Sequence, residues 1–134
     1  MNTKTASCFC GQLQIEVQGE PLGVGLCHCL ACQQRTGSVF AALAAFRAPF
    51  KVSGQATEFV RTGDQGGQFR FSFCPTCGST VFHTEVGQPG SVAVAVGAFA
   101  DPSFPPPQDS VYDCRRHLWV KLPEGVIVHE TDPG

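Results

Sequence analysis

Seven of the eight cysteines lie in three short clusters, and their spacing constrains this chain more than any other feature. The clusters are CFC at residues 8–10, CHCLAC at 27–32 and CPTC at 74–77. Thiolates this close together can reach one metal ion, and tetrahedral zinc takes three or four such ligands at about 2.0–2.3 Å. Two pairs would complete a closed four-thiolate site, and the other three thiolates would leave one zinc position open for chemistry. The count of seven therefore predicts two zinc ions per chain.

A disulfide framework and a redox-active dithiol are the two alternatives to metal binding. Disulfides are common in small secreted domains, but the N-terminal segment MNTKTAS is short and polar, unlike a secretory signal. Disulfides within CxC or CxxC are strained and usually redox-active. The glycine that follows CPTC, Gly78, permits the positive φ that a metal-binding knuckle needs. Metal binding is the favoured interpretation, and clustered thiols without a signal indicate a reducing, cytoplasmic location.

Length and charge narrow the function further. A chain of 134 residues is expected to form a single domain, residues 1–134. Charged residues make up 15% of the chain, the net charge is −2, and the nine lysines and arginines are scattered. This composition disfavours nucleic acid as a partner. No apolar run reaches the roughly 18 residues of a membrane span, so a membrane partner is not expected and a small molecule is.

Strand patterns dominate the chain, and we expect a mostly antiparallel β fold with very little helix. Residues 31–35 predict one helical turn that ends at Gly37. Residues 38–46 are apolar throughout, which is typical of a strand buried on both faces. The C-terminal segment 111–125 predicts one or two short strands that cross back over the sheet. The remaining predicted strands, including two hairpins around GDQGGQ and GQPG, are residues 13–17, 57–61, 69–73, 80–84 and 91–99.

The eleven phenylalanines are expected to pack the core of this β fold. The prediction applies in particular to Phe59, Phe69, Phe71 and Phe73, which recur with the alternation of a strand.

Strand geometry suggests how the cysteine clusters combine. Cys8 and Cys10, two residues apart, can point to the same face of a strand. Cys74 and Cys77 can form a knuckle at the end of a strand, and the two pairs together would close a tetrathiolate site. Spacing alone leaves a second pairing open, in which Cys27 and Cys32 join the knuckle instead.

The remaining histidines and the eighth cysteine are weaker candidates. His28 lies between two thiols and is expected to support them or to face solvent. His83 could be a fourth ligand or a general base, but a surface or core position is favoured. Cys114 has no neighbouring thiol and predicts a buried free cysteine. His117 and His129 are isolated and predict structural roles.

The motifs CFCGQLQIEV, CHCLACQQRTGS and FRFSFCPTCGST, followed by RRHLWVKLP, resemble the glutathione-dependent formaldehyde-activating enzymes (GFA), a family that includes the centromere protein V domain (CENP-V). The resemblance covers roughly residues 6–123. It implies stacked antiparallel sheets similar to the methionine sulfoxide reductase B fold. It also implies a structural zinc and an open zinc, whose ligands are Cys8, Cys10, Cys74 and Cys77 for the first and Cys27, Cys29 and Cys32 for the second.

The resemblance implies a carbon–sulfur lyase that joins glutathione and formaldehyde as S-hydroxymethylglutathione, with Cys27, Cys29 and Cys32 as the catalytic cluster. Arg35 is the arginine best placed in sequence to bind a glutathione carboxylate. Gln33, Thr36 and Ser38 are candidate hydrogen-bond donors to the substrate. The alternative is a non-catalytic zinc domain that binds a thiol, a metabolite or a protein, and the sequence leaves the oligomeric state open.

Overall fold

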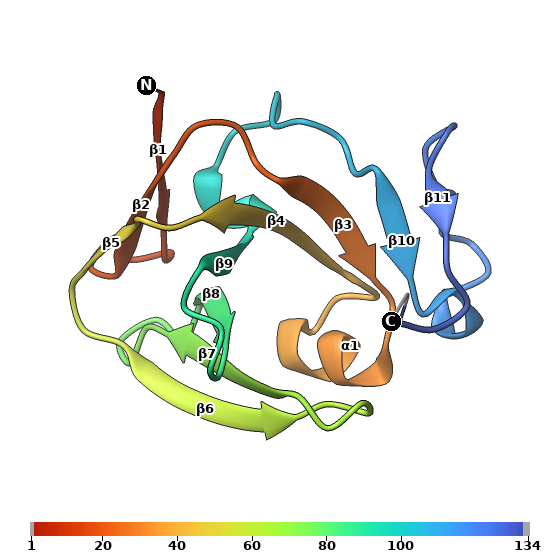
Figure 1. Cartoon of the computed structure of the whole chain (residues 1–134), viewed down its shortest axis with the longest axis horizontal. Coiled ribbons are helices and arrows are strands. Elements are labelled where there is room, and N and C mark those ends of the chain that lie inside the picture. Colours follow the sequence, from red (N-terminus) through yellow and green to blue (C-terminus); the bar gives the residue numbers. More distant parts are fainter. Residues whose placement is uncertain (1, 133–134) are drawn as a thin grey trace.

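The computed structural model describes residues 2–132, whose strands form two sheets (Figure 1). The smaller sheet has three antiparallel strands in the order β1-β2-β5. These strands are β1 (Thr3–Ser7), β2 (Gln14–Gln18) and β5 (Lys51–Ser53).

The larger sheet has eight strands in the order β11-β10-β3-β4-β9-β8-β7-β6. Neighbours from β3 to β6 in this order are antiparallel, whereas β10 runs parallel to both β3 and β11. The strands are β3 (Gly23–Cys27), β4 (Ala41–Arg47), β6 (Thr57–Thr62), β7 (Gln68–Phe73), β8 (Thr80–Glu85), β9 (Ser91–Ala95), β10 (Asp109–Val111) and β11 (Ile127–Val128).

Helix is sparse in the described part of the chain. One α-helix, α1 (Leu30–Thr36), is accompanied by two 3-10 turns, η1 (Val96–Phe99) and η2 (Asp113–Arg115). Within residues 2–132, no helix is long and apolar enough to cross a membrane. The predicted β-rich class with minimal helix is confirmed.

The core lies between the two sheets. Ala44, Val94 and Phe82 form one cross-strand row of the large sheet. They are buried in one cluster with Ile15 and Val17 of β2, which contacts β4 and β8. Because side chains alternate across a strand, one face of the large sheet is committed to this core.

The opposite face of the large sheet bears a different set of residues. The register places Phe59 opposite Phe71, Phe71 opposite His83 and His83 opposite Ala93. In Figure 1 this face curves around α1, which lies between the β6–β7 hairpin and strands β3 and β4. Apolar and titratable side chains therefore gather beside the helix rather than in the core.

Several strand predictions are confirmed within a few residues: β2, the β6–β7 hairpin and the β8–β9 hairpin. The helical turn is also confirmed, and Gly37 ends it with a left-handed φ of 72°. Strands β1 and β5 were not predicted. Strand β4 starts at Ala41 rather than at residue 38, and only one of its faces is fully buried.

Two fold predictions are wrong. The C-terminal segment 111–125 holds the 3-10 turn η2 and no strand beyond Val111, and β10 and β11 on either side of it extend the edge of the large sheet in parallel with β3. Phe46 and Phe82 do lie in the core, but the four phenylalanines singled out for it do not belong to that cluster: Phe71 is buried, Phe69 and Phe73 are half-buried, and Phe59 is 63% exposed. The sequence correctly predicts that these side chains share one face of their strands, but this face is the one that does not contact the second sheet.

Candidate metal centres and adjoining pockets

The structure brings together the sulfurs of Cys8, Cys10, Cys74 and Cys77, all within 4.8 Å of one another. The Cys10 sulfur is 3.7 Å from the sulfurs of Cys8 and Cys74. A tetrahedron built on zinc–sulfur bonds of about 2.3 Å has sulfur–sulfur edges of about 3.8 Å. The thiol spacing therefore fits one tetrahedral ion, which we call the four-thiol centre.

Hydrogen-bond donors surround this centre. The backbone N–H of Leu13 donates to Cys8 Sγ at 3.3 Å, and the N–H groups of Thr76 and Cys77 donate to Cys74 Sγ at 3.3 and 3.4 Å. The side-chain amide of Gln12 donates to Cys74 Sγ at 3.0 Å. Donors of this kind favour sulfur in its thiolate form, which is the form that binds metal.

The knuckle turn itself follows the sequence pattern. Gly78 has a φ of 83° and donates its N–H to the Cys74 carbonyl, so a residue without a Cβ is needed there. The hydroxyl of Ser79, and then its backbone, lower the pKa of Cys77 to about 5. These contacts favour the thiolate form of Cys77, the form that binds metal.

A second group contains the sulfurs of Cys27, Cys29 and Cys32, again within 4.8 Å of one another. Cys27 ends β3, Cys29 caps the N-terminus of α1 and Cys32 lies in the first turn, where its N–H donates to Cys29 Sγ at 3.3 Å. Within residues 2–132, no further histidine, cysteine or carboxylate joins this group. We call it the three-thiol centre.

Mutual hydrogen bonding polarises the three-thiol centre. The Cys27 and Cys32 thiols hydrogen-bond to Cys29 and lower its pKa, and the Arg61 charge adds to this effect. The same contacts with Cys29 and Cys32 raise the pKa of Cys27. These contacts favour the thiolate form at Cys29, and a bound cation would favour three thiolates.

His28 lies between Cys27 and Cys29 in the sequence, is fully buried, and points away from the three-thiol centre toward Ser110 of β10. Its Nε2 lies 2.9 Å from the Ser110 hydroxyl, and burial lowers its pKa. Its Nδ1 has no hydrogen-bond partner among the described residues. The surface alternative for His28 is wrong, and the residue instead anchors the β3–α1 connection to β10.

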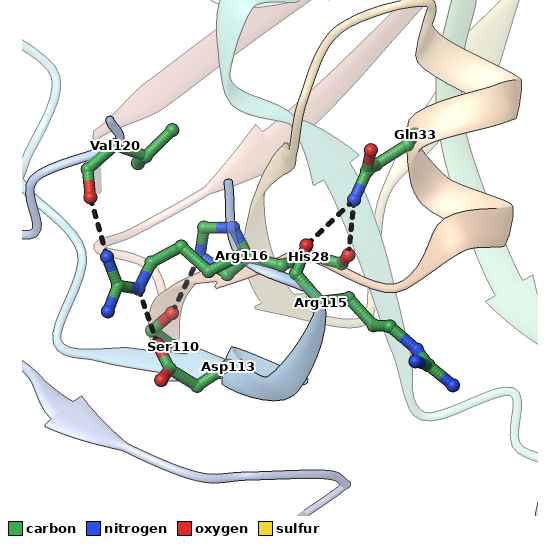
Figure 2. Close-up of polar contacts among 7 residues, drawn as sticks. All are labelled: His28, Gln33, Ser110, Asp113, Arg115, Arg116 and Val120. Carbon is green, nitrogen blue, oxygen red and sulfur yellow. Dashed lines mark hydrogen bonds and ion pairs between the residues drawn. The ribbon is translucent and has the colours of Figure 1, made fainter. Parts of the chain in front are cut away.

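Gln33 extends this anchor, as Figure 2 shows. Its amide donates to the carbonyls of His28 at 2.8 Å and Arg115 at 3.2 Å, and its carbonyl lies 2.9 Å from His117 Nε2. Arg116 then bridges Asp113 and the Val120 carbonyl, both at 2.7 Å. The C-terminal segment is thereby fastened to the loop that carries the three-thiol centre.

The other predicted substrate residues lie around the helix. Thr36 donates its hydroxyl to the Cys32 carbonyl and accepts from the N–H of Ser38, so both close the helix end. Neither they nor Gln33 line the two pockets described below. Arg35 does line one pocket, and its guanidinium lies 3.8 Å from Cys32 Sγ.

A pocket of about 770 Å³ opens beside the three-thiol centre, and we call it the thiol pocket. All three sulfur-bearing residues line it. The charged residues that line it are Arg61, Asp64, Glu85 and Asp132. One cation and three carboxyl groups therefore face the space next to the cluster.

A second pocket of about 530 Å³ lies between α1 and the β6–β7 hairpin, and we call it the aromatic pocket. It shares Cys32, Arg61 and Phe71 with the thiol pocket. The guanidinium carbon of Arg35 lies 4.7 Å from the centre of the Phe71 ring, a cation–π distance. Its full lining is Ala31, Cys32, Gln34, Arg35, Phe59, Arg61, Phe71, Phe73 and Thr80.

His83 and Cys114 lie near the centre without joining it. The His83 ring packs on Phe71 with ring centres 4.7 Å apart, and burial, then the charges of Arg35 and Arg61, lower its pKa to about 4. It is therefore neutral at pH 7. Cys114 is exposed rather than buried, which corrects the prediction, and it borders a third cavity with Cys29.

Sequence reasoning missed several residues of these sites. Asp64 lies within the glycine-rich turn GDQGGQ, and Arg61 ends the predicted strand before it, where nothing in the sequence distinguished it from the other arginines. The Tyr112 hydroxyl donates to Asp64 at 3.1 Å and ties this hairpin to the end of β10. Gln12 gave no local signal, because its partner Cys74 is 62 residues away.

Comparisons with known proteins identify a matching family and a similar fold. The model of the family described as glutathione-dependent formaldehyde-activating enzyme matches residues 3–120. The structure is similar to the crystal structure of a Rhodobacter sphaeroides protein from a structural genomics programme, with a TM-score of 0.54 and 26% sequence identity. That similarity covers 70% of this chain and 85% of the other chain. No protein in the curated set matches the sequence.

Proposed function

Because the chain belongs to the family of glutathione-dependent formaldehyde-activating enzymes, we propose that it is a zinc-dependent carbon–sulfur lyase acting on glutathione or another thiol adduct. The single observation that carries this proposal is the three-thiol centre, which opens into a pocket and which no fourth described ligand closes. We also propose that residues 1–134 act as one cytoplasmic domain of this family.

The donor chemistry of both centres fits zinc. The four-thiol centre offers a complete tetrahedral set with N–H donors on its sulfurs, which is typical of a structural site. The three-thiol centre offers one ligand fewer. When bound there by Cys27, Cys29 and Cys32, zinc would accept a sulfur ligand and favour its thiolate form.

The chain's own residues define where a thiol substrate would lie. Its sulfur would approach Cys27, Cys29 and Cys32 from the thiol pocket, and its carboxylate would pair with Arg61, which lines that pocket. The neutral His83 and the rings of Phe69 and Phe71 line the same space. In the addition, a carbon–sulfur bond forms at the carbonyl carbon, and the thiol proton ends on the carbonyl oxygen.

A non-catalytic thiol- or metabolite-binding domain is the second candidate, and the charges of the thiol pocket favour it. Glutathione carries two carboxylates, but Asp64, Glu85 and Asp132 face Arg61 across this pocket. Like charges weaken binding of such a ligand. A ligand with an amine beside its thiol would suit this pocket better.

The proposal predicts two metal ions per chain and sulfur coordination at the three-thiol centre. Elemental analysis of protein purified under reducing conditions gives the count. Titration of glutathione into the cobalt-substituted protein should then change the sulfur-to-cobalt absorption. A count near one, or no spectral change at millimolar glutathione with both sites filled, would contradict it.

Two arginine variants test which arginine binds a glutathione carboxylate. Arg61→Gln should weaken glutathione about tenfold or more, because a charge-assisted hydrogen bond is lost. Arg35→Gln tests the pairing predicted from sequence, and Arg47→Gln, an exposed arginine at the end of β4, is the control. Acceleration of thiol addition to formaldehyde, absent in Cys29→Ala, would distinguish the enzyme from the binding domain.

A further inference from the structure

The aromatic pocket has a chemistry of its own. Helix α1 contributes Cys32 and Arg35. The β6–β7 hairpin contributes Arg61 and the phenylalanines Phe59, Phe71 and Phe73. Its volume of about 530 Å³ is typical of a small-molecule site and far exceeds what formaldehyde needs. It adjoins the three-thiol centre through Cys32, which lines both pockets.

The apolar part of this pocket comes from strand register. Phe59 lies opposite Phe71, and Phe73 follows two residues later on the same face. Phe71 is buried, Phe73 is half-buried and Phe59 is 63% exposed. Three rings thus present one apolar surface toward α1, and the exposed ring of Phe59 stands at its rim.

The charged part of this pocket is purely cationic. Arg35 and Arg61 line it, and no aspartate or glutamate does. Across residues 2–132, neither arginine forms an ion pair with a carboxylate. Arg35 lies over Phe71 in a cation–π contact and donates from Nη2 to Cys32 Sγ at 3.8 Å, which leaves its other N–H groups for a ligand carboxylate. An apolar surface beside the Arg35 guanidinium, which lines only this one of the two pockets, matches an aromatic group that carries a carboxylate.

We propose that the aromatic pocket binds an aryl carboxylate, carried as the substituent of the aldehyde to which the thiol adds. This inference rests on the proposed function for its reaction, but not for its binding. The thiol sulfur bonds to the aldehyde carbon, the carbonyl π electrons move to oxygen, and the thiol proton ends there as the hydroxyl of a hemithioacetal. No further reactant is needed.

Each of the two pockets would hold one of the two reactants. Glutathione has no aromatic group that would pack on the three phenylalanine rings, whereas its carboxylate can pair with Arg61 in the thiol pocket. An aldehyde carbon placed beside Cys32 would direct its substituent into the aromatic pocket. The aromatic pocket would therefore select among aldehydes by their substituent, which formaldehyde lacks.

Binding is tested first, with the unreactive probe 4-(hydroxymethyl)benzoate and the metal-loaded protein, by ligand-observed NMR and calorimetry. Phe59→Ala and Arg35→Gln should each weaken the probe roughly fivefold to tenfold. Both side chains are partly exposed and line only this one of the two pockets. The matched controls are Val60→Ala, on the opposite face of β6, and Arg47→Gln; both should bind as the parent does.

Reaction is tested second, with glutathione and three aldehydes. The structure predicts 4-formylbenzoate over benzaldehyde by about tenfold in kcat/KM, and Phe59→Ala should reduce this preference. No probe binding at millimolar concentration, or binding by both Phe59→Ala and Arg35→Gln as tight as that of the parent, would overturn the pocket assignment. Turnover of formaldehyde without preference for 4-formylbenzoate would overturn the substrate class and leave the proposed function standing. No acceleration of any aldehyde would reject the proposed function, while the binding result would still decide the pocket.

Discussion

Gln12 shows how one side chain can join a metal centre to a distant loop. Its amide donates to Cys74 Sγ at 3.0 Å and to the Gln55 carbonyl at 2.7 Å, and its carbonyl accepts from the Gln55 N–H at 2.9 Å. The loop can approach this closely because residue 54 is glycine. A Cβ at this position would lie 1.8 Å from the backbone carbonyl oxygen of Gln12. The thiolate and the loop backbone therefore depend on the same amide group.

Gln12→Ala should lower the free energy of unfolding by about 1–3 kcal/mol, because three hydrogen bonds lose their partner. Thermal and denaturant unfolding of the metal-loaded protein measure the loss. Gln14→Ala is the matched control, since Gln14 is also half-buried and makes one bond, to the Gly11 carbonyl. Equal losses in the two variants would show that the Cys74 and Gln55 contacts contribute nothing special.

His83 makes stability depend on pH in a definite direction. Its pKa falls from an ordinary 6.5 to about 4 on folding, because burial and then Arg35 and Arg61 disfavour the imidazolium. The unfolded chain therefore binds more protons between these values, and stability is lost as pH falls. Glu85, a carboxylate, lies on the same face two residues further along β8.

His83→Gln should remove a stability loss of about 2 kcal/mol between pH 7 and pH 5. Denaturant unfolding of the parent and the variant at both pH values gives this difference. His129→Gln, an exchange at a half-buried histidine at the C-terminal side, is the control. Identical pH slopes for parent and His83→Gln would refute the depressed pKa.

At the scale of the element, α1 matters because it positions two of the three thiols. A helix of seven residues is too short to be stable alone. Cys29 caps its N-terminus, accepting from the Cys32 N–H, and Gly37 closes its C-terminus in the left-handed conformation. The geometry of the three-thiol centre therefore depends on the two helix ends.

Gly37→Ala should cost about 1–2 kcal/mol, because any Cβ disfavours a φ of 72°. No atom lies within 4 Å of the added Cβ, so the cost is conformational rather than steric. Gly90→Ala is the control: its Cβ also meets nothing and its φ is not positive, so no loss is expected. Thermal unfolding compares them, and unchanged stability of Gly37→Ala would show that the helix end relaxes freely.

At the scale of the whole molecule, the four-thiol centre connects the two sheets. Cys8 and Cys10 lie between β1 and β2 of the small sheet, and Cys74 and Cys77 lie between β7 and β8 of the large sheet. Metal bound there would hold the sheets together and contribute directly to folding. The three-thiol centre lies instead between β3 and α1, at one edge of the pockets.

Cys74→Ala should therefore lower stability by several kcal/mol, whereas Cys29→Ala should cost much less and mainly affect the pocket chemistry. Cys74 is fully buried and accepts hydrogen bonds from three N–H donors, so its loss leaves unsatisfied groups as well as an incomplete ligand set. Melting temperatures and metal content of the two variants provide the test. Similar melting temperatures would contradict the assignment of structural and open centres.

Local spacing in the sequence determined much of this protein. The cysteine clusters, the turn at Gly78, the helix stop at Gly37 and the two hairpins are all short-range features, so a few neighbouring residues suffice to predict them. The family followed from the same motifs in their order, and the family match confirmed it.

Only the tertiary structure decided which segments meet. The 64-residue separation of Cys10 and Cys74 is closed by the packing of two sheets, and spacing alone had left another pairing open. Alternation predicted that Phe59 and Phe71 share a face, but not that this face would turn from the core toward α1. Which face of a strand is buried depends on the register and curvature of the whole sheet, and these arise from pairings between residues far apart in the chain.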